Sequence, residues 1–206
     1  MLIEINPHNI DSRRIAEVCD VLNKGGIVIF PTDTVYSMGC SLEHPKAIAE
    51  LAKLKGIKPN KANFSLICKD LSTLSEFTKQ ISRPVYKAMN KALPGPFTFI
   101  LTASNRIPKL FGQSKKTVGI RIPDNNIVLE IIDRLGAPLV GTSIHDEDEI
   151  LDYTTDPYAI YERYEKSVDI LIDGGYGNNE ASTVIDCSEG DFDVIREGIG
   201  DLTLIL

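Results

Sequence analysis

Two hydroxyls and one carboxylate, those of Thr32, Asp33 and Thr34, directly follow the apolar segment GIVIF (residues 26–30). Such a segment predicts a strand covered on both faces, and Pro31 ends it because proline cannot donate to a ladder. Open α/β sheets bind ligands just beyond the C-terminal ends of their strands. The three side chains are therefore candidates for ligand binding, although a turn that they cap themselves explains them equally well.

Four further places could bind an anion, three through cationic side chains and one through backbone N–H groups. Arg121, in GIRIP, and Arg196, in VIREG, alternate with apolar neighbours on predicted strands, so each faces either solvent or a cleft. The segment DGGYGNN (residues 173–179) could offer N–H groups to a phosphate, but it has neither the Walker nor the GxGxxG spacing. Four lysines lie at a predicted helix end, where cations are favourable even without a ligand: Lys53, Lys55, Lys58 and Lys61.

Several classes of chemistry are not supported. The three histidines, His8, His44 and His145, lack metal-ligand spacing, and no nucleophile–His–acid set can be drawn. We therefore expect no metal site formed by the protein. The four cysteines are far apart and form no C-x-x-C pair, which favours reduced thiols in the core.

Length and charge limit the number of domains and the kinds of ligand that we expect for this protein. The chain has 206 residues, and we expect a single domain over residues 1–206. Its 22 basic and 29 acidic residues give a net charge of −7, so any site for a polyanion must be a local patch. The N-terminal segment does not resemble a signal peptide and no apolar run is long enough to span a membrane, so we expect a cytoplasmic protein.

Helical and strand patterns alternate along the chain, which predicts an α/β sheet of mixed strand direction. The residues from 31 to 40 are expected to form a loop. Helices are predicted over residues 9–24, 44–56, 71–77, 83–93, 126–136 and 158–166, and strands over 26–30, 64–68, 97–103, 118–122, 137–143, 168–175, 182–187 and 192–197.

Six collinear segments together resemble the YrdC/YciO family: GGIVIFPTDTVYSMGC, LAKLKGIKP, LPGPFTFIL, VGIRIP, APLVGTS and STVID…IREG. The similarity runs from about residue 24 to residue 198. It implies a twisted mixed sheet with flanking helices in a YrdC-like fold, and a concave, positively charged cleft. Some members are described as binding double-stranded RNA or tRNA.

The best-known members of this family are L-threonylcarbamoyladenylate synthases. The resemblance implies that ATP, as a substrate with Mg²⁺, reacts with L-threonine and bicarbonate to give threonylcarbamoyl-AMP and pyrophosphate for the t⁶A modification of tRNA. In such a reaction the carbamate oxygen attacks the α-phosphorus. That step needs positioning and charge neutralisation more than a protein nucleophile.

The resemblance also implies roles for particular residues. Thr34 would line the threonine pocket, and Arg121 would bind the threonine carboxylate, which suits a guanidinium fork. The expected catalytic residues are Lys55, Arg121 and Ser143. The residues expected to hold the nucleotide are Lys55, Lys58, Ser143, Ser182, Thr183 and Arg196.

This chain departs from the synthase pattern in three places. The K-x-R-P signature is altered, because KGIKP has Ile57 where arginine is expected and Lys58 one position later. The S-x-N signature has His145 in place of asparagine. The family's histidine after an earlier strand is replaced by Cys68 or Lys69, depending on the alignment. These features, with NFSLICKDLS and GPFTFIL, place the chain closer to the YciO branch.

A block of four acids, Asp146 to Glu149, begins where the synthase asparagine should be. Two unit charges about 4 Å apart interact by about 4 kcal/mol at an effective dielectric near 20, so acids facing a triphosphate would oppose its binding. An outward, solvated loop would have little effect. The remaining alternatives are metal coordination and a cleft adapted to a different ligand.

Three functions remain open at this point. The leading one is a YciO-like enzyme that binds ATP and forms threonylcarbamoyl-AMP, with activity reduced by the altered signatures. The second is a protein that binds double-stranded RNA, tRNA or a nucleotide without turnover. The third is an adenylating enzyme for another amine.

Overall fold

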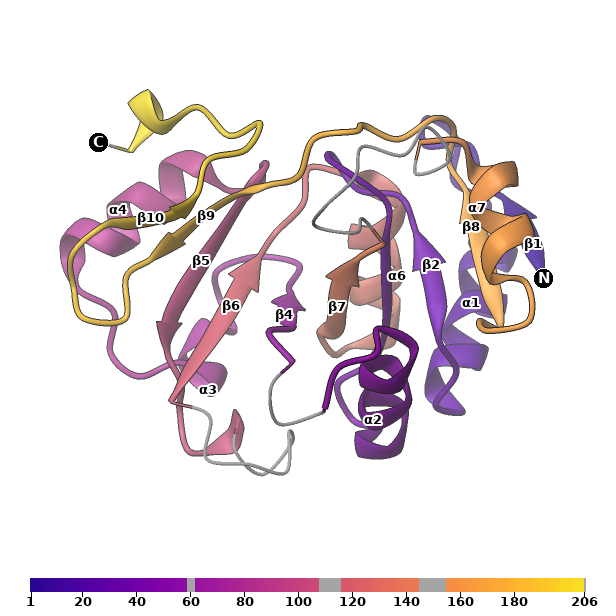
Figure 1. Ribbon diagram of the computed structural model, residues 1–206, viewed down its shortest axis with the longest axis horizontal. Coiled ribbons are helices and arrows are strands. Elements are labelled where there is room, and N and C mark those ends of the chain that lie inside the picture. Colours follow the sequence, from indigo (N-terminus) through magenta and orange to yellow (C-terminus); the bar gives the residue numbers. More distant parts are fainter. Residues whose placement is uncertain (59–61, 108–115, 145–154, 206) are drawn as a thin grey trace.

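The computed structural model describes residues 1–58, 62–107, 116–144 and 155–205, and these form a twisted ten-stranded sheet of mixed direction with flanking helices (Figure 1). The strand order is β1-β8-β2-β3-β7-β4-β6-β5-β9-β10. The strands are β1 (Leu2–Glu4), β2 (Val28–Phe30), β3 (Ser37–Ser41), β4 (Ser65–Ile67), β5 (Phe97–Thr102), β6 (Thr117–Arg121), β7 (Leu139–Ser143), β8 (Ile170–Asp173), β9 (Thr183–Asp186) and β10 (Asp193–Arg196).

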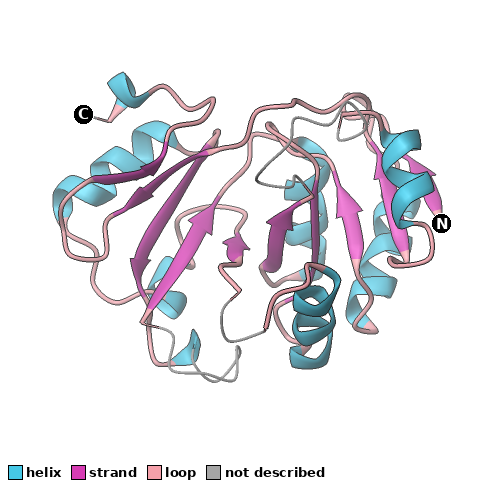
Figure 2. Ribbon diagram, in the orientation of Figure 1, coloured by secondary structure: helices cyan, strands magenta, loops and turns pink. Residues whose placement is uncertain are grey.

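The helices confirm the predicted alternation. They are α1 (Ser12–Asn23), α2 (Pro45–Leu54), α3 (Leu74–Phe77), α4 (Arg83–Ala92), α6 (Asn126–Leu135) and α7 (Pro157–Tyr164), followed by the 3₁₀ turn η3 (Leu202–Leu204). The N-terminus lies at the β1 end of the sheet, and the C-terminus lies near α4 at the β10 end (Figure 2). None of the helices in these described ranges is long and apolar enough to cross a membrane.

The expectation of a loop through residues 31–40 is wrong in its second half. The segment SMGCS forms β3, which pairs antiparallel with both β2 and β7. All five of its residues are buried, but three of them are serine or glycine, which are typical of turns. Only Met38 and Cys40 alternate with them, and two apolar residues are too few to predict a strand. Only the residues between Pro31 and Tyr36 connect β2 to β3.

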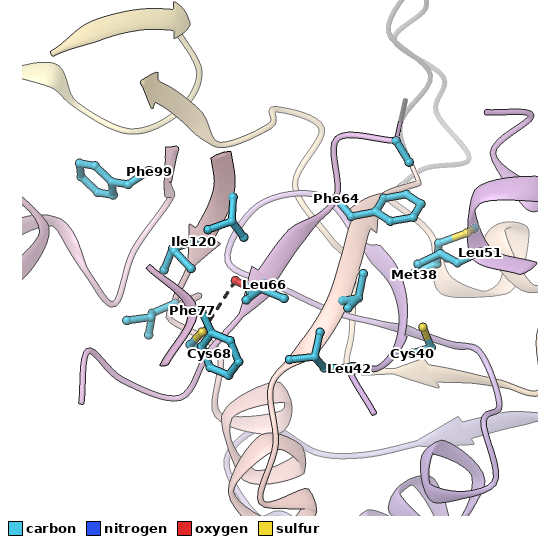
Figure 3. Packing of buried hydrophobic residues seen from close by; sticks show 14 of the residues in the cluster. Met38, Cys40, Leu42, Leu51, Phe64, Leu66, Cys68, Phe77, Phe99 and Ile120 are labelled. Carbon is cyan, nitrogen blue, oxygen red and sulfur yellow. Dashed lines mark hydrogen bonds between the residues drawn. The ribbon is translucent and has the colours of Figure 1, made fainter. Parts of the chain in front are cut away.

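The two faces of the sheet are covered to different extents. On one face a large core joins α2, α3, α4 and α7 to strands along most of the sheet. Figure 3 shows part of this core, with Phe99, Ile120 and Leu66 contributed by β5, β6 and β4. On the opposite face, α1 and α6 cover β1, β8 and β2, and their cluster ends at Leu139 on β7 and Ile67 on β4. No residue of β5, β6 or β9 belongs to this second cluster.

The four cysteines are free and buried, at Cys19, Cys40, Cys68 and Cys187. Burial raises the pKa of the Cys40 and Cys68 thiols to about 12 and that of Cys187 to about 11. Because the thiolate is the reactive form, we expect no labelling of the folded protein by a thiol reagent at pH 8, and four equivalents after unfolding in guanidinium chloride. Rapid labelling of the native protein would contradict this burial.

Candidate functional site

The uncovered part of the second face forms a cleft of about 570 Å³. Its floor contains Gly119 of β6 and Gly141 of β7, together with Ser65 of β4. A Cβ added at Gly119 would lie 2.8 Å from Oγ of Ser65, and one added at Gly141 would lie 2.5 Å from Cδ1 of Ile67. Glycine at these two positions therefore keeps the floor low, so that a ligand can approach the strands.

Two arginines lie at opposite ends of one row across this floor. Arg196 pairs with Val184, which pairs with Thr98. The β5–β6 register places Thr98 beside Arg121. Since adjacent strands are about 4.8 Å apart, the row separates the two arginine Cα atoms by about 14 Å. The cleft therefore offers two cations three strands apart, which suits a ligand with two anionic groups.

Arg121 is held by the loop that follows β2. Its Nη2 donates to Oγ1 of Thr32 at 3.0 Å and to Oγ1 of Thr34 at 2.7 Å. The same nitrogen forms an ion pair with Oδ1 of Asp33 at 2.7 Å, and the two side chains are only 8 % and 10 % exposed. The polar residues after β2 thus position Arg121 in the cleft wall.

This ion pair leaves hydrogen-bonding capacity unused. Nε of Arg121 and Oδ2 of Asp33 are both buried and have no partner among the described residues. Buried polar groups are normally hydrogen-bonded, so each unpaired atom in a native protein calls for an explanation. An amino-acid or carboxylate ligand beside Arg121 would meet a guanidinium that is already oriented and still has donors available.

Arg196 occupies the opposite wall of the cleft, on β10. Its Nε and Nη2 donate to the carbonyl oxygen of Ser182 at 3.1 Å and 2.9 Å. The Ser182 hydroxyl lies 3.0 Å from Oγ1 of Thr98, and both side chains line the cleft. Thr183 does not line the cleft, because its hydroxyl donates to Gly200 and accepts from the Gly198 N–H.

Ser143 lies at the end of β7 and lines the cleft, opposite Ser37 of β3. Lys55 caps the C-terminus of α2, and Lys58 follows it on the exposed surface. Neither lysine is among the described residues that line the cleft, although Asn63 and Phe64, farther along the same connection, are. The structure thus brings together Arg121, Ser143, Ser182 and Arg196, places Thr34 against Arg121, and leaves both lysines outside this lining.

Neither alignment candidate for the missing family histidine reaches the cleft. Cys68 is buried in the core, with its Sγ 4.0 Å from the carbonyl oxygen of Leu66 (Figure 3). Lys69 forms an exposed ion pair with Asp133 of α6. The side chain of this segment that does line the cleft is Ile67, so an apolar group faces the ligand here. His145 and the acids Asp146 to Glu149 lie outside the described residues.

The glycine-rich segment after β8 packs against the protein. Tyr36 accepts from the Gly174 N–H at 3.2 Å and donates to the carbonyl of Gly175 at 2.7 Å. The N–H groups of Gly177 and Asn178 bond to backbone carbonyls at 2.8 Å and 3.1 Å. Three N–H groups that could have met a phosphate are therefore already used.

Among residues 1–58, 62–107, 116–144 and 155–205, no group of three or more His, Cys, Asp or Glu residues could hold a metal ion.

Residues 20–198 match the Sua5/YciO/YrdC family model, which is described as telomere recombination. The chain belongs to this family. It is 36 % identical over 197 residues to an uncharacterised protein of Haemophilus influenzae, an alignment that covers 95 % of this chain and 94 % of that one. It is 35 % identical over 200 residues to the uncharacterised protein YciO of Escherichia coli, covering 96 % and 95 % of the two chains.

Two crystal structures of family members share this fold. That of E. coli YciO superimposes with a TM-score of 0.91 at 34 % identity, covering 100 % of this chain and 99 % of that one. That of P. abyssi Sua5 complexed with L-threonine gives a TM-score of 0.85 at 24 % identity, covering 96 % of this chain and 57 % of the other. The predicted fold class and the resemblance to the YciO branch are confirmed.

Sequence reasoning missed part of the cleft lining. Ser65, Gly119 and Gly141 form its floor, and Asp186 and Ile195 lie at its β9–β10 end. At β9 the residues that face the cleft are Ser182, Val184 and Asp186, and those between them face the core. The sequence carries no clear signal of this, because the cleft-facing Val184 is apolar and the core-facing Thr183 is polar.

Proposed function

We propose that this protein binds ATP and L-threonine in the cleft and, with bicarbonate, forms threonylcarbamoyl-AMP and pyrophosphate. The observation that carries the proposal is the placement of Arg121 and Arg196, three strands apart, in the lining of one cleft whose floor contains glycine and serine. Membership of the Sua5/YciO/YrdC family supports it. So does the L-threonine complex of P. abyssi Sua5, which has the same fold.

Arg121 would bind the threonine carboxylate. Its Nη2 is occupied by the loop after β2 and Asp33 compensates its charge, so the carboxylate would bind through the remaining N–H groups. A guanidinium held in place loses little freedom when it binds a carboxylate. Thr34 therefore acts by orienting Arg121 as well as by lining the threonine pocket.

The amine of the bound threonine would attack the carbon of bicarbonate, forming a carbamate with loss of water. The carbamate oxygen then forms a bond to the α-phosphorus as the bond to the pyrophosphate oxygen breaks. Ser143 would donate to the phosphates, while Ser182 and Arg196 hold the nucleotide at the opposite wall. Lys55 and Lys58 would approach the triphosphate from the loop after α2. Mg²⁺ would arrive with ATP, since it usually binds through substrate phosphates and keeps several of its waters.

A specific observation favours a second candidate, nucleotide or RNA binding without turnover. Where the synthases carry a phosphate-clamp arginine, this chain has Ile57, which is 38 % exposed and cannot neutralise a phosphate. RNA would need a local basic strip, and the candidates are Lys53, Lys55, Lys58, Lys61 and Lys69. This strip is weakened because Lys53 pairs with Glu50 and Lys69 pairs with Asp133. RNA binding would be recognised by an affinity for RNA that falls steeply as the salt concentration rises.

The two candidates are separated by pyrophosphate release from ATP in the presence of Mg²⁺, bicarbonate and L-threonine, with each substrate omitted in turn. Release that requires both threonine and bicarbonate, with threonylcarbamoyl-AMP as the product, is the expected result. ATP binding without release would favour the binding role or another amine acceptor.

Replacing Lys55 by alanine is expected to weaken ATP binding by about 10- to 100-fold, the usual effect of losing one hydrogen bond to a charged group. Lys53→Ala is the matched control, because Lys53 lies on the same helix and pairs with Glu50. Calorimetric titration of both variants measures the difference. Equal affinities would remove Lys55 from the site.

A further inference from the structure

Asp186 is the single acid among the described residues that line the cleft, and the proposed reaction gives it no role. Its Oδ1 accepts from the Ser188 N–H at 2.8 Å, and no other partner of this side chain occurs among the described residues. The second carboxylate oxygen is therefore an acceptor available at the β9–β10 end of the cleft.

A β-bulge brings an apolar side chain to the same place. Val194 pairs with Ile185 and Arg196 pairs with Val184, so Ile195 is an extra residue in β10. Successive residues of a strand normally point to opposite faces, but Ile195 and Arg196 both line the cleft. Bulges redirect side chains in this way. Ile195 is 57 % exposed, so its side chain is accessible to a ligand in the cleft.

The surroundings of Asp186 are apolar on the cleft side. Ile100 pairs directly with it across β5 and β9, and Val184 precedes it on the same face of β9. Asp193, its partner on β10, adds a second negative charge. Arg196 pairs with Val184 on the same hairpin and offsets part of this charge. The apolar contacts beside Asp186 suit a flat, uncharged ring with a hydrogen-bond donor on its edge.

We propose that Asp186 selects a nucleobase with an exocyclic amine, whose edge donates to the free carboxylate oxygen while Ile100, Val184 and Ile195 contact its faces. The inference rests on the proposed function, since it requires a nucleoside triphosphate in this cleft. The phosphates then extend toward Ser143, four strands away in the sheet, or about 19 Å at the usual strand spacing. Asp186 is thus a specificity-determining residue that reads a 6-amino purine.

The test compares ATP with ITP, whose 6-oxo group presents an acceptor where ATP presents a donor. Calorimetric titration with Mg²⁺ should show that the parent binds ATP at least about 10-fold more tightly than ITP, the usual effect of one hydrogen bond to a charged group. Asp186→Ala should lose this preference mainly through weaker ATP binding. Asp193→Ala is the matched control, because Asp193 lies opposite on the same hairpin and is not among the cleft-lining residues, and it should keep the preference.

Three outcomes would overturn the inference. Equal affinities of the parent for ATP and ITP would show that the base edge is not read. A gain in affinity for both nucleotides in Asp186→Ala would show that the acid only repels phosphate. If the parent binds neither nucleotide at millimolar concentration, the proposed function itself fails and the inference falls with it.

Discussion

Replacing Gly119 by valine should abolish ATP binding while the protein remains folded. The new Cβ would lie 2.8 Å from Oγ of Ser65 and 3.5 Å from Cγ2 of Thr98, and the serine hydroxyl can rotate away. Valine is favourable in a strand, so stability should be maintained. Its two methyl groups would project into the cleft floor and displace the ligand. Forcing added methyl groups into occupied space costs up to about 3 kcal/mol, so we expect ATP affinity to fall by about 100-fold.

Calorimetric titration, together with a thermal unfolding curve, measures both effects. Glu4→Val is the matched control, since it also adds valine to a strand but lies on β1, at the opposite end of the sheet. It should bind ATP like the parent. A folded Gly119→Val variant with unchanged ATP affinity would show that nucleotide does not bind over β6.

Replacing Asp33 by alanine should lower the free energy of unfolding by about 3–5 kcal/mol, the range found when one partner of a buried ion pair is removed. The guanidinium of Arg121 would remain buried, and its partners among the described residues would be the hydroxyls of Thr32 and Thr34. The same change would release Arg121 from its orientation, so threonine binding by the folded fraction should weaken as well.

Urea unfolding followed by circular dichroism measures this loss of stability. Lys69→Ala removes an exposed pair with Asp133, whose side chains are 50 % and 54 % exposed, and should change stability by about 0–1 kcal/mol. If Asp33→Ala lost no more stability than Lys69→Ala, water would have to reach the Arg121 guanidinium in the native protein.

The strands with continuous or alternating apolar residues were predictable from the sequence. A strand buried on both faces has apolar residues at every position, and one buried on a single face has them at every second position. This applies to β2, β5 and β6, and to helices such as α6, whose N-cap Asn125 accepts from two backbone N–H groups. β3 was missed because a strand packed between close neighbours can consist of small residues. An added Cβ at Gly39 would lie 2.5 Å from the Val140 carbonyl oxygen, which explains the glycine.

The site was predictable only in part. Arg121 and the residues Thr32 to Thr34 were singled out separately, but their contact joins positions 87 to 89 apart in the chain, which local pattern does not report. The cleft exists because α1 and α6 cover half of one face and nothing among the described residues covers the rest. Such unequal coverage is a property of tertiary packing. Sequence alignment likewise could not show that Ile67, rather than Cys68 or Lys69, faces the cleft.

The most direct measurement is a crystal structure of the protein with a non-hydrolysable ATP analogue, Mg²⁺ and L-threonine. We expect the threonine carboxylate within hydrogen-bonding distance of Arg121, and the nucleotide over Gly119 with its base beside Asp186. Ligand bound elsewhere, for example in the cavity beside Lys69 and Asp133, would rule out this site, and so would an empty cleft at saturating ligand.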